Sequence, residues 1–177
     1  MKAVKRALKV NKNMDYLFLR RHRRTATSER QKSLLFKAAE RQWEQQFADK
    51  ETEGRKVDCT LYKCILYNLE IKQRFLDSEL SLKKFSAMVD TNQTYLSNVV
   101  NKYFNCNLKE LLNTYRVEYA KELLHDGKCS LDELPRRCGF ASKSAFYAAF
   151  SKIAGMSPLR FQSHERNPFL SESTTYV

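Results

Sequence analysis

The sequence has few glycines and prolines, and its N-terminal region contains no long apolar run. Only 4 Gly and 3 Pro occur among 177 residues, which argues against a β-rich or collagen-like protein and favours helices. The longest apolar stretch near the N-terminus, residues 16–19, is far shorter than the ~20 residues that cross a membrane. We therefore expect an all-α protein without a membrane span, located in the cytoplasm.

Paired cysteines and catalytic motifs are also missing. The 5 cysteines are an odd number without a Cys-x-x-Cys pair, which argues against a disulfide framework or a zinc site. The 3 histidines are scattered along the chain, and neither a Gly-rich phosphate loop nor a nucleophile motif occurs. We therefore expect the protein not to be an enzyme and to need no cofactor or metal.

Positive charge is the main feature that is present. The formal net charge is +12, which indicates an acidic partner such as nucleic acid or anionic lipid. Residues 1–30 alone contribute +8, from ten basic and two acidic side chains, whereas residues 78–163 contribute only +4. We expect a mobile basic arm over residues 1–30 and a tail over residues 164–177.

Two helices are expected before residue 78. Residues 29–49 and 57–77 have apolar side chains at helical spacing, and the polar stretch 50–56 separates them. We expect residues 31–77 to form a helical lead-in region that could dock onto RNA polymerase or a sensory partner.

The stretches 80–112 and 129–161 repeat one pattern: a capped short helix, a break, a second helix, a stop and a third capped helix. The break and the stop need residues that tolerate a left-handed backbone, and the helix starts need side chains that cap. The matching residues are Ser81 and Ser130 at the first caps, Asp90 and Gly139 at the break, Asn105 and Gly155 at the stop, and Asn107 and Ser157 at the last caps.

A connector with helical spacing, residues 108–125, joins the two copies. At ~1.5 Å per residue it spans roughly 27 Å, compared with the ~34 Å between successive major grooves of B-DNA. Tandem protein-binding units could have the same spacing, but the match favours DNA. The predicted fold is all-α, with two helix-turn-helix subdomains (80–107 and 129–163) joined by the connector and preceded by two helices and the basic arm.

The second helix of each copy has an outward face without acids. We expect Leu96, Val99, Val100 and Tyr103 to face inward in the first copy, and Phe146, Phe150 and Ile153 in the second. Amides, hydroxyls and lysines remain outside, and these groups bind base edges and phosphates without electrostatic repulsion. A solvated helix face that carries no acid by chance is the alternative.

At these residues the chain resembles the AraC-type transcription regulators. The second copy matches that family at Gly139, Phe140, Phe146, Phe150, Lys152, Gly155, Pro158 and Phe161. The first copy, with "TNQTYLS" and "NTYRVEYAKELL", resembles a subgroup common in Bacteroidetes. The resemblance covers about residues 78–163 and implies two recognition helices that read adjacent major-groove segments of double-stranded DNA.

The resemblance, together with the outward faces and the helix caps, gives a set of candidate contacts. We expect base contacts from Gln93, Thr94, Ser97, Asn98, Lys143, Ser144, Tyr147 and Ala148. We expect phosphate contacts from Asn92, Asn101, Lys102, Ser142, Ser151, Lys152 and Arg160.

Two residues depart from the family pattern. Ala148 stands where arginine is frequent, so we expect less base specificity from the second copy. Pro135 stands at the expected fifth position of a helix, where it removes a backbone donor and crowds the preceding turn. We therefore expect the first helix of that copy to be kinked or short.

A different class of function is the alternative. The chain could be a protein-interaction or signal-coupling module that binds nucleic acid non-specifically through the basic arm. Residues 31–77 are too short for the sugar-binding barrel of many AraC-type proteins, so the sequence shows no effector pocket. If the repeat carries the binding energy, changes at Asn98 and Lys143 should alter sequence preference.

Overall fold

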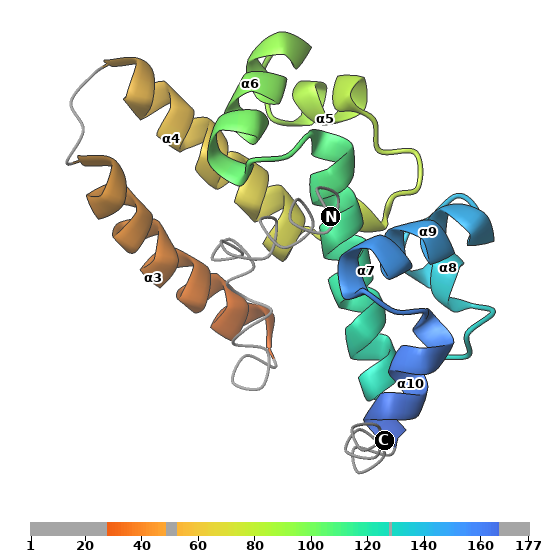
Figure 1. Cartoon of the computed structure of the whole chain (residues 1–177). Coiled ribbons are helices and arrows are strands. Elements are labelled where there is room, and N and C mark those ends of the chain that lie inside the picture. The colour runs from red at the N-terminus through yellow and green to blue at the C-terminus, as the bar shows by residue number, and fades with distance from the viewer. Residues whose placement is uncertain (1–27, 49–52, 128, 167–177) are drawn as a thin grey trace, which may run out of the picture. The chain divides into compact units, whose positions relative to one another are not determined.

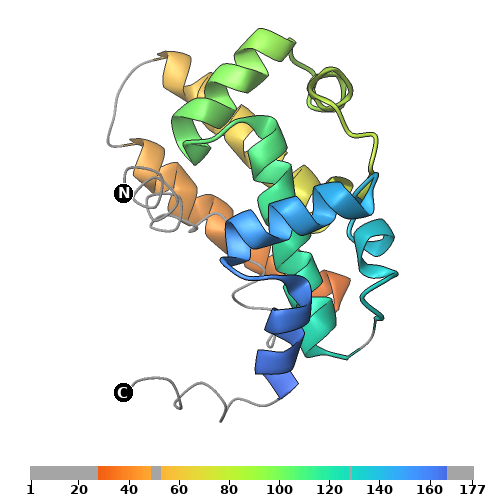
Figure 2. The ribbon, with the colours of Figure 1, turned by 45° about the vertical axis from the view of Figure 1, so that its right-hand side comes forward.

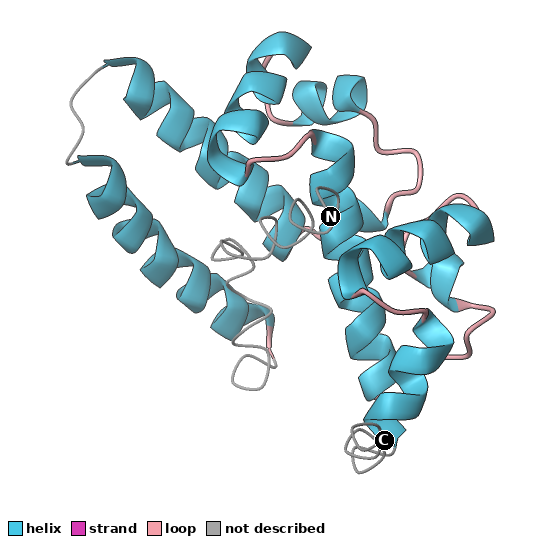
Figure 3. Cartoon of the chain, viewed as in Figure 1, coloured by secondary structure: helices cyan, strands magenta, loops and turns pink. Residues whose placement is uncertain are grey.

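The computed structural model describes residues 28–48, 53–127 and 129–166 (Figure 1). These residues form helices, turns and loops and no strand (Figure 3), which confirms the all-α fold class. The predicted basic arm lies outside the described residues except for its last three positions, and so does most of the predicted tail. No helix in the described ranges has the length and hydrophobicity needed to cross a membrane.

The described part of the chain contains eight α-helices, a π-helix (η1) and a 3-10 helix (η2). They are α3 (Glu29–Ala48), α4 (Glu53–Leu66), η1 (Tyr67–Ile71), η2 (Arg74–Leu76), α5 (Leu82–Met88), α6 (Gln93–Phe104), α7 (Leu108–His125), α8 (Leu134–Arg137), α9 (Lys143–Ala154) and α10 (Pro158–Arg166). The polar residues 53–56, predicted to be loop, instead form the first turn of α4. Glu, Arg and Lys are good helix formers, so polarity alone did not indicate a loop there.

The chain divides into two compact units. The N-terminal unit contains the described residues up to Arg74 together with Leu80–Leu111, and the C-terminal unit contains Phe75–Glu79 and the residues from Leu112 onward. Each unit contains one helix-turn-helix motif, formed by α5 and α6 in the first and by α8 and α9 in the second (Figure 2).

In the N-terminal unit, α4 contacts α3 on one side and α6 on another. Phe36 of α3 is 5% exposed and meets the ring of Tyr67 edge-on, with the ring centroids 5.6 Å apart. Tyr62 of α4 stacks on Phe104 of α6 at 5.1 Å. Because aromatic pairs add to the free energy of burial, these contacts make the lead-in helices part of the unit that carries the first motif.

The predicted stops and most of the predicted caps are confirmed. Asp90, Gly139, Asn105 and Gly155 all have a left-handed backbone, with φ of 52°, 78°, 54° and 74°. The side chains of Ser81, Asn107 and Ser157 accept hydrogen bonds from backbone amides three residues later, at 3.2, 2.9 and 3.3 Å. Local sequence thus determines where these helices begin and end.

The first helix of the second motif is short, as predicted, but it begins later than predicted. Helix α8 has 4 residues, compared with 7 in α5. Pro135 lies in its first turn and not at a fifth helical position, because the missing N–H of proline costs no helical hydrogen bond there. The N-cap position is Glu133, without a side-chain hydrogen bond, so the prediction of a cap at Ser130 was wrong.

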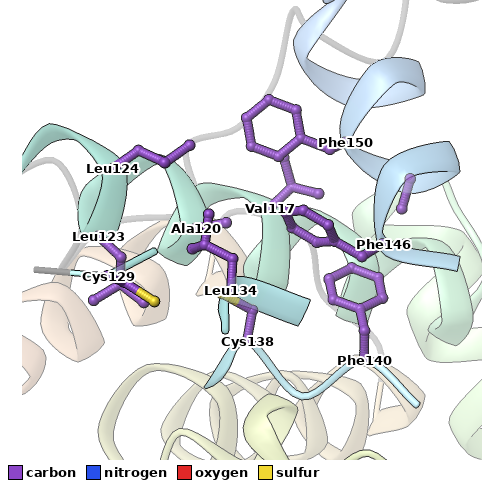
Figure 4. Close-up of a cluster of buried hydrophobic side chains, with 11 residues drawn as sticks. Val117, Ala120, Leu123, Leu124, Cys129, Leu134, Cys138, Phe140, Phe146 and Phe150 are labelled. Carbon is purple, nitrogen blue, oxygen red and sulfur yellow. The ribbon is translucent and has the colours of Figure 1, made fainter. Parts of the chain in front are cut away.

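The C-terminal unit has an aromatic core (Figure 4). Phe146 and Phe150 of α9 are fully buried, as predicted, and Ile153 packs against the cluster. Phe146 lies 5.3 Å from the ring of Phe140, and Phe150 lies 5.7 Å from that of Phe161. This core fixes which side of α9 faces outward.

The short segment of residues 75–79, which precedes α5 in the chain, is held within the C-terminal unit by contacts with α7 and with the turn at Gly139. The buried guanidinium of Arg116 in α7 donates from Nε to the carbonyl oxygen of Phe75 at 2.7 Å and from Nη2 to that of Asp77 at 2.8 Å. The same guanidinium lies 5.5 Å from the ring centroid of Phe140. The turn at Gly139 touches this segment closely, since a Cβ on Gly139 would lie 2.6 Å from the carbonyl oxygen of Leu76.

We predict that Gly139→Ala lowers the free energy of unfolding by about 2–5 kcal/mol. A left-handed alanine costs about 1–2 kcal/mol, and the overlap with a backbone oxygen adds about 1–3 kcal/mol. Gly127→Ala is the matched control, because Gly127 also has a positive φ of 65° but has nothing within 4 Å of its added Cβ. Urea unfolding followed by circular dichroism measures both. Equal losses in the two variants would show that the segment 75–79 does not press on Gly139.

Candidate nucleic-acid interface

Helix α6 presents a polar surface on which Lys102 is the only charged side chain of the helix. Its N-cap Asn92 accepts a hydrogen bond through Oδ1 from the amide of Tyr95 at 2.8 Å. Burial of Leu96, Val99 and Val100, each at most 1% exposed, turns the opposite side outward. The predicted contact residues on that side are exposed or half-buried: Gln93, Thr94, Ser97, Asn98 and Asn101. Tyr103, predicted to face inward, is only half-buried, and Phe104 takes a core position that sequence analysis missed.

Helix α9 presents a second such surface. Its N-cap Ser142 accepts a hydrogen bond through Oγ from the amide of Ala145 at 3.2 Å. All predicted outward residues are exposed: Lys143, Ser144, Tyr147, Ala148, Ser151 and Lys152. The ring of Tyr147 is held edge-on against Phe146 at 5.4 Å, so its position is set by the core. Arg160, the remaining phosphate candidate, is exposed on α10.

Neither α6 nor α9 contains an acid, but acids from other elements reach both helices. Lys102 of α6 pairs with Asp58 of α4 at 2.6 Å. Lys143 of α9 pairs with Asp132, from the turn before α8, at 2.7 Å. Sequence analysis missed both partners because they lie 44 and 11 residues away along the chain. The acid-free faces predicted from each helix alone therefore have acidic neighbours.

Asp58 accepts three hydrogen bonds from α6. Its Oδ1 accepts from the hydroxyl of Tyr95 at 2.6 Å, and its Oδ2 accepts from Lys102 Nζ at 2.6 Å and from the hydroxyl of Tyr103 at 2.8 Å. Burial alone would raise the pKa of Asp58, but these bonds outweigh burial and lower it below 3.8. The hydrogen bond to Asp58, together with burial, raises the pKa of Tyr95 to about 12.

The ion pair of α9 is of a different kind. The Lys143 and Asp132 side chains are 64% and 87% exposed, whereas Lys102 and Asp58 are 55% and 10% exposed, so the two pairs differ in the burial of their acids. The hydrogen bond between the exposed pair lowers the pKa of Asp132 and raises that of Lys143. Water screens such pairs, and they contribute little to stability, so Lys143 can exchange this partner for another at small cost.

No metal site is found among the described residues, in which no three His, Cys, Asp or Glu side chains are grouped to hold an ion. Cys59, Cys129 and Cys138 are buried, in keeping with a packing role. The chemistry that the surfaces of α6 and α9 offer is that of hydrogen-bond donors, hydrogen-bond acceptors and exposed basic groups.

Comparison with known proteins agrees with this geometry. Residues 85–164 match the family model of a helix-turn-helix domain. The melibiose operon regulatory protein of Escherichia coli (strain K12) is 27% identical over 86 residues, which are 49% of this chain and 28% of that protein. The chain thus spans less than a third of that relative's length.

Solved structures extend the comparison to the fold. The C-terminal domain of AraT, a response regulator from Geobacillus stearothermophilus, is 26% identical, with a TM-score of 0.53 over 67% of this chain and 93% of that domain. The DNA-binding domain of AdpA, a global transcriptional factor solved in complex with a target DNA, has a TM-score of 0.54 over 62% of this chain and 97% of that domain, at 22% identity. Because the identity to AdpA is only 22%, this match supports a shared fold and nothing more. Residues 85–164 thus match a helix-turn-helix domain and are similar in sequence and fold to parts of bacterial transcription regulators.

Proposed function

We propose that the chain is a sequence-specific transcription regulator that reads two adjacent major-groove segments, one with α6 and one with α9. The observation that carries this proposal is the pair of capped helices in a helix-turn-helix domain, each held by a buried core and each exposing hydrogen-bonding side chains and no acid of its own. Such side chains can pair with base edges in the major groove.

The proposed contacts follow from exposure and side-chain chemistry. Base contacts come from Gln93, Thr94, Ser97, Asn98, Lys143, Ser144, Tyr147 and Ala148. Phosphate contacts come from Asn92, Asn101, Ser142, Ser151, Lys152 and Arg160. Lys102 belongs to the same phosphate set only if its ion pair with Asp58 opens. The methyl group of Ala148 can touch a thymine methyl but cannot read guanine, so most base discrimination falls to α6.

We further propose that the protein works in the cytoplasm, where bacterial DNA lies, and that it belongs to a Bacteroidetes-like subgroup of AraC-type proteins, on the basis of "TNQTYLS" and "NTYRVEYAKELL". Its lead-in helices α3 and α4 offer a place for RNA polymerase or a sensory partner to dock. The alternative, an interaction module that binds nucleic acid only through the basic arm, leaves the two capped and exposed faces without a role.

Selection of bound duplexes from a random DNA pool tests the proposal. We expect the protein to enrich two short motifs about one helical turn, ~10.5 base pairs, apart. Asn98→Ala should relax the motif read by α6, and Lys143→Ala the motif read by α9, each by about 1–3 kcal/mol of discrimination. Lys37→Ala, which removes an exposed charge from α3, is the control for Lys143→Ala and should leave both motifs intact.

Salt dependence separates this proposal from the alternative. Binding through the basic arm alone would give no enriched motif, and its affinity would collapse as salt rises. That result, or motifs that survive both substitutions, would reject sequence reading by α6 and α9.

A further inference from the structure

Lys102 is the single charged side chain of α6, and the structure pairs it with an acid. The helix sequence, QTYLSNVVNKYF, otherwise contains only uncharged residues. Lys102 Nζ lies 2.6 Å from Asp58 Oδ2 and 5.0 Å from the centroid of the Tyr103 ring. The ion pair therefore neutralises the only charge that α6 carries.

The same carboxylate holds α6 at both ends. Tyr95 is in the first turn of the helix, and Lys102 and Tyr103 are in the last. Residues seven apart lie on the same side of a helix, two turns from each other, so Tyr95 and Lys102 both face α4. A rotation of α6 about its own axis would break the bonds to both Asp58 oxygens at once.

We propose that Asp58 is a positioning residue for DNA recognition, which fixes the rotation of α6 and keeps Lys102 away from phosphate. This inference rests on the proposed function of α6. It assigns the lead-in helix α4 a direct part in specificity, because α6 then contacts DNA through uncharged groups while its charged side chain stays paired with Asp58.

The expected effect of this device is on the ratio of specific to non-specific binding. A free lysine on α6 would bind phosphate on any DNA and would raise the affinity for every duplex equally. An α6 whose rotation is no longer fixed by Asp58 would in addition lose base contacts that are made only on the preferred duplex, and this loss lowers the ratio. Each phosphate contact steepens the decline of log affinity with log salt by ~0.9. Opening the ion pair would leave the buried Asp58 carboxylate with two hydroxyl donors and no cation, which is costly in a poorly solvated site.

Four proteins test the inference: the wild type, Asp58→Asn, Lys102→Gln and the double variant, each titrated with a random-sequence duplex between about 50 and 200 mM salt. We expect Lys102→Gln to leave the salt slope of the wild type unchanged. We expect Asp58→Asn to steepen the slope by ~0.9, and we expect the double variant to return to the wild-type slope. We expect Asp58→Asn to lower the ratio of affinity for the preferred duplex to affinity for random DNA by about threefold or more.

Asp90→Asn is the matched control, because it removes the same charge from an exposed position in the same unit and keeps a residue that tolerates φ of 52°. We expect the salt slope of Asp90→Asn to equal that of the wild type, because Lys102 stays paired with Asp58 in this variant. If Lys102→Gln flattens the wild-type slope by ~0.9, Lys102 already binds phosphate and the inference is wrong. A wild type without any preferred duplex would instead reject the proposed function, while the random-duplex slopes would still report whether Asp58 withholds Lys102.

The DNA-free protein provides an independent test through pH. The folded pKa of Asp58 is lowered, so its stabilising contribution is present above the ordinary value of 3.8 and is lost as pH falls through the lowered pKa. We expect the urea midpoint of Asp58→Asn to lie below that of the wild type at pH 6 and to converge with it in acid. Equal midpoints at pH 6 would show that Asp58 does not hold α6.

Discussion

A short helix can read a surface only if its rotation about its own axis is fixed, and both motifs depend on this constraint. In α9 the constraint is met by Phe146 and Phe150, which are fully buried in an aromatic core. In α6 the buried aliphatic residues are smaller, and the carboxylate of Asp58 adds polar bonds to the first and last turns. Because polar bonds are directional, they resist rotation more sharply than aliphatic packing alone.

The sequence predicted the features that depend on neighbouring residues. Caps and left-handed stops depend on a few adjacent positions, so Asn107, Asn105 and Gly155 could be assigned from residue type. The inward phenylalanines followed from helical period. The outward faces followed in turn, and the structure exposes or half-exposes every predicted contact residue on them. Their contacts with DNA stay predictions, since they depend on a partner.

Contacts between distant segments could not be predicted in the same way. The ion pair of Asp58 with Lys102 joins residues 44 apart, and the hydrogen bond of Arg116 to Phe75 joins residues 41 apart. A single sequence does not indicate which distant residues pair. An acid among apolar residues at helical spacing, such as Asp58, indicates only that a cation or hydrogen-bond donor is needed nearby. The start of α8 was also predicted wrongly, but for a local reason. The helix begins at Leu134 and not just after Ser130, so Pro135 lies in the first turn, where its missing N–H costs no helical hydrogen bond.

The lysines of α6 and α9 are paired with acids that differ in burial, and this difference suits the two helices to different parts in the proposed function. Lys102 is held by a buried acid that also accepts two tyrosine hydroxyls, whereas Lys143 faces an exposed acid that water screens. Lys143 can therefore turn to DNA at little cost, whereas the release of Lys102 would leave the buried Asp58 carboxylate without its cation. With Ala148 unable to read guanine, α9 is suited to charge-assisted orientation on the duplex. The amides and hydroxyls of α6 are suited to choosing the sequence.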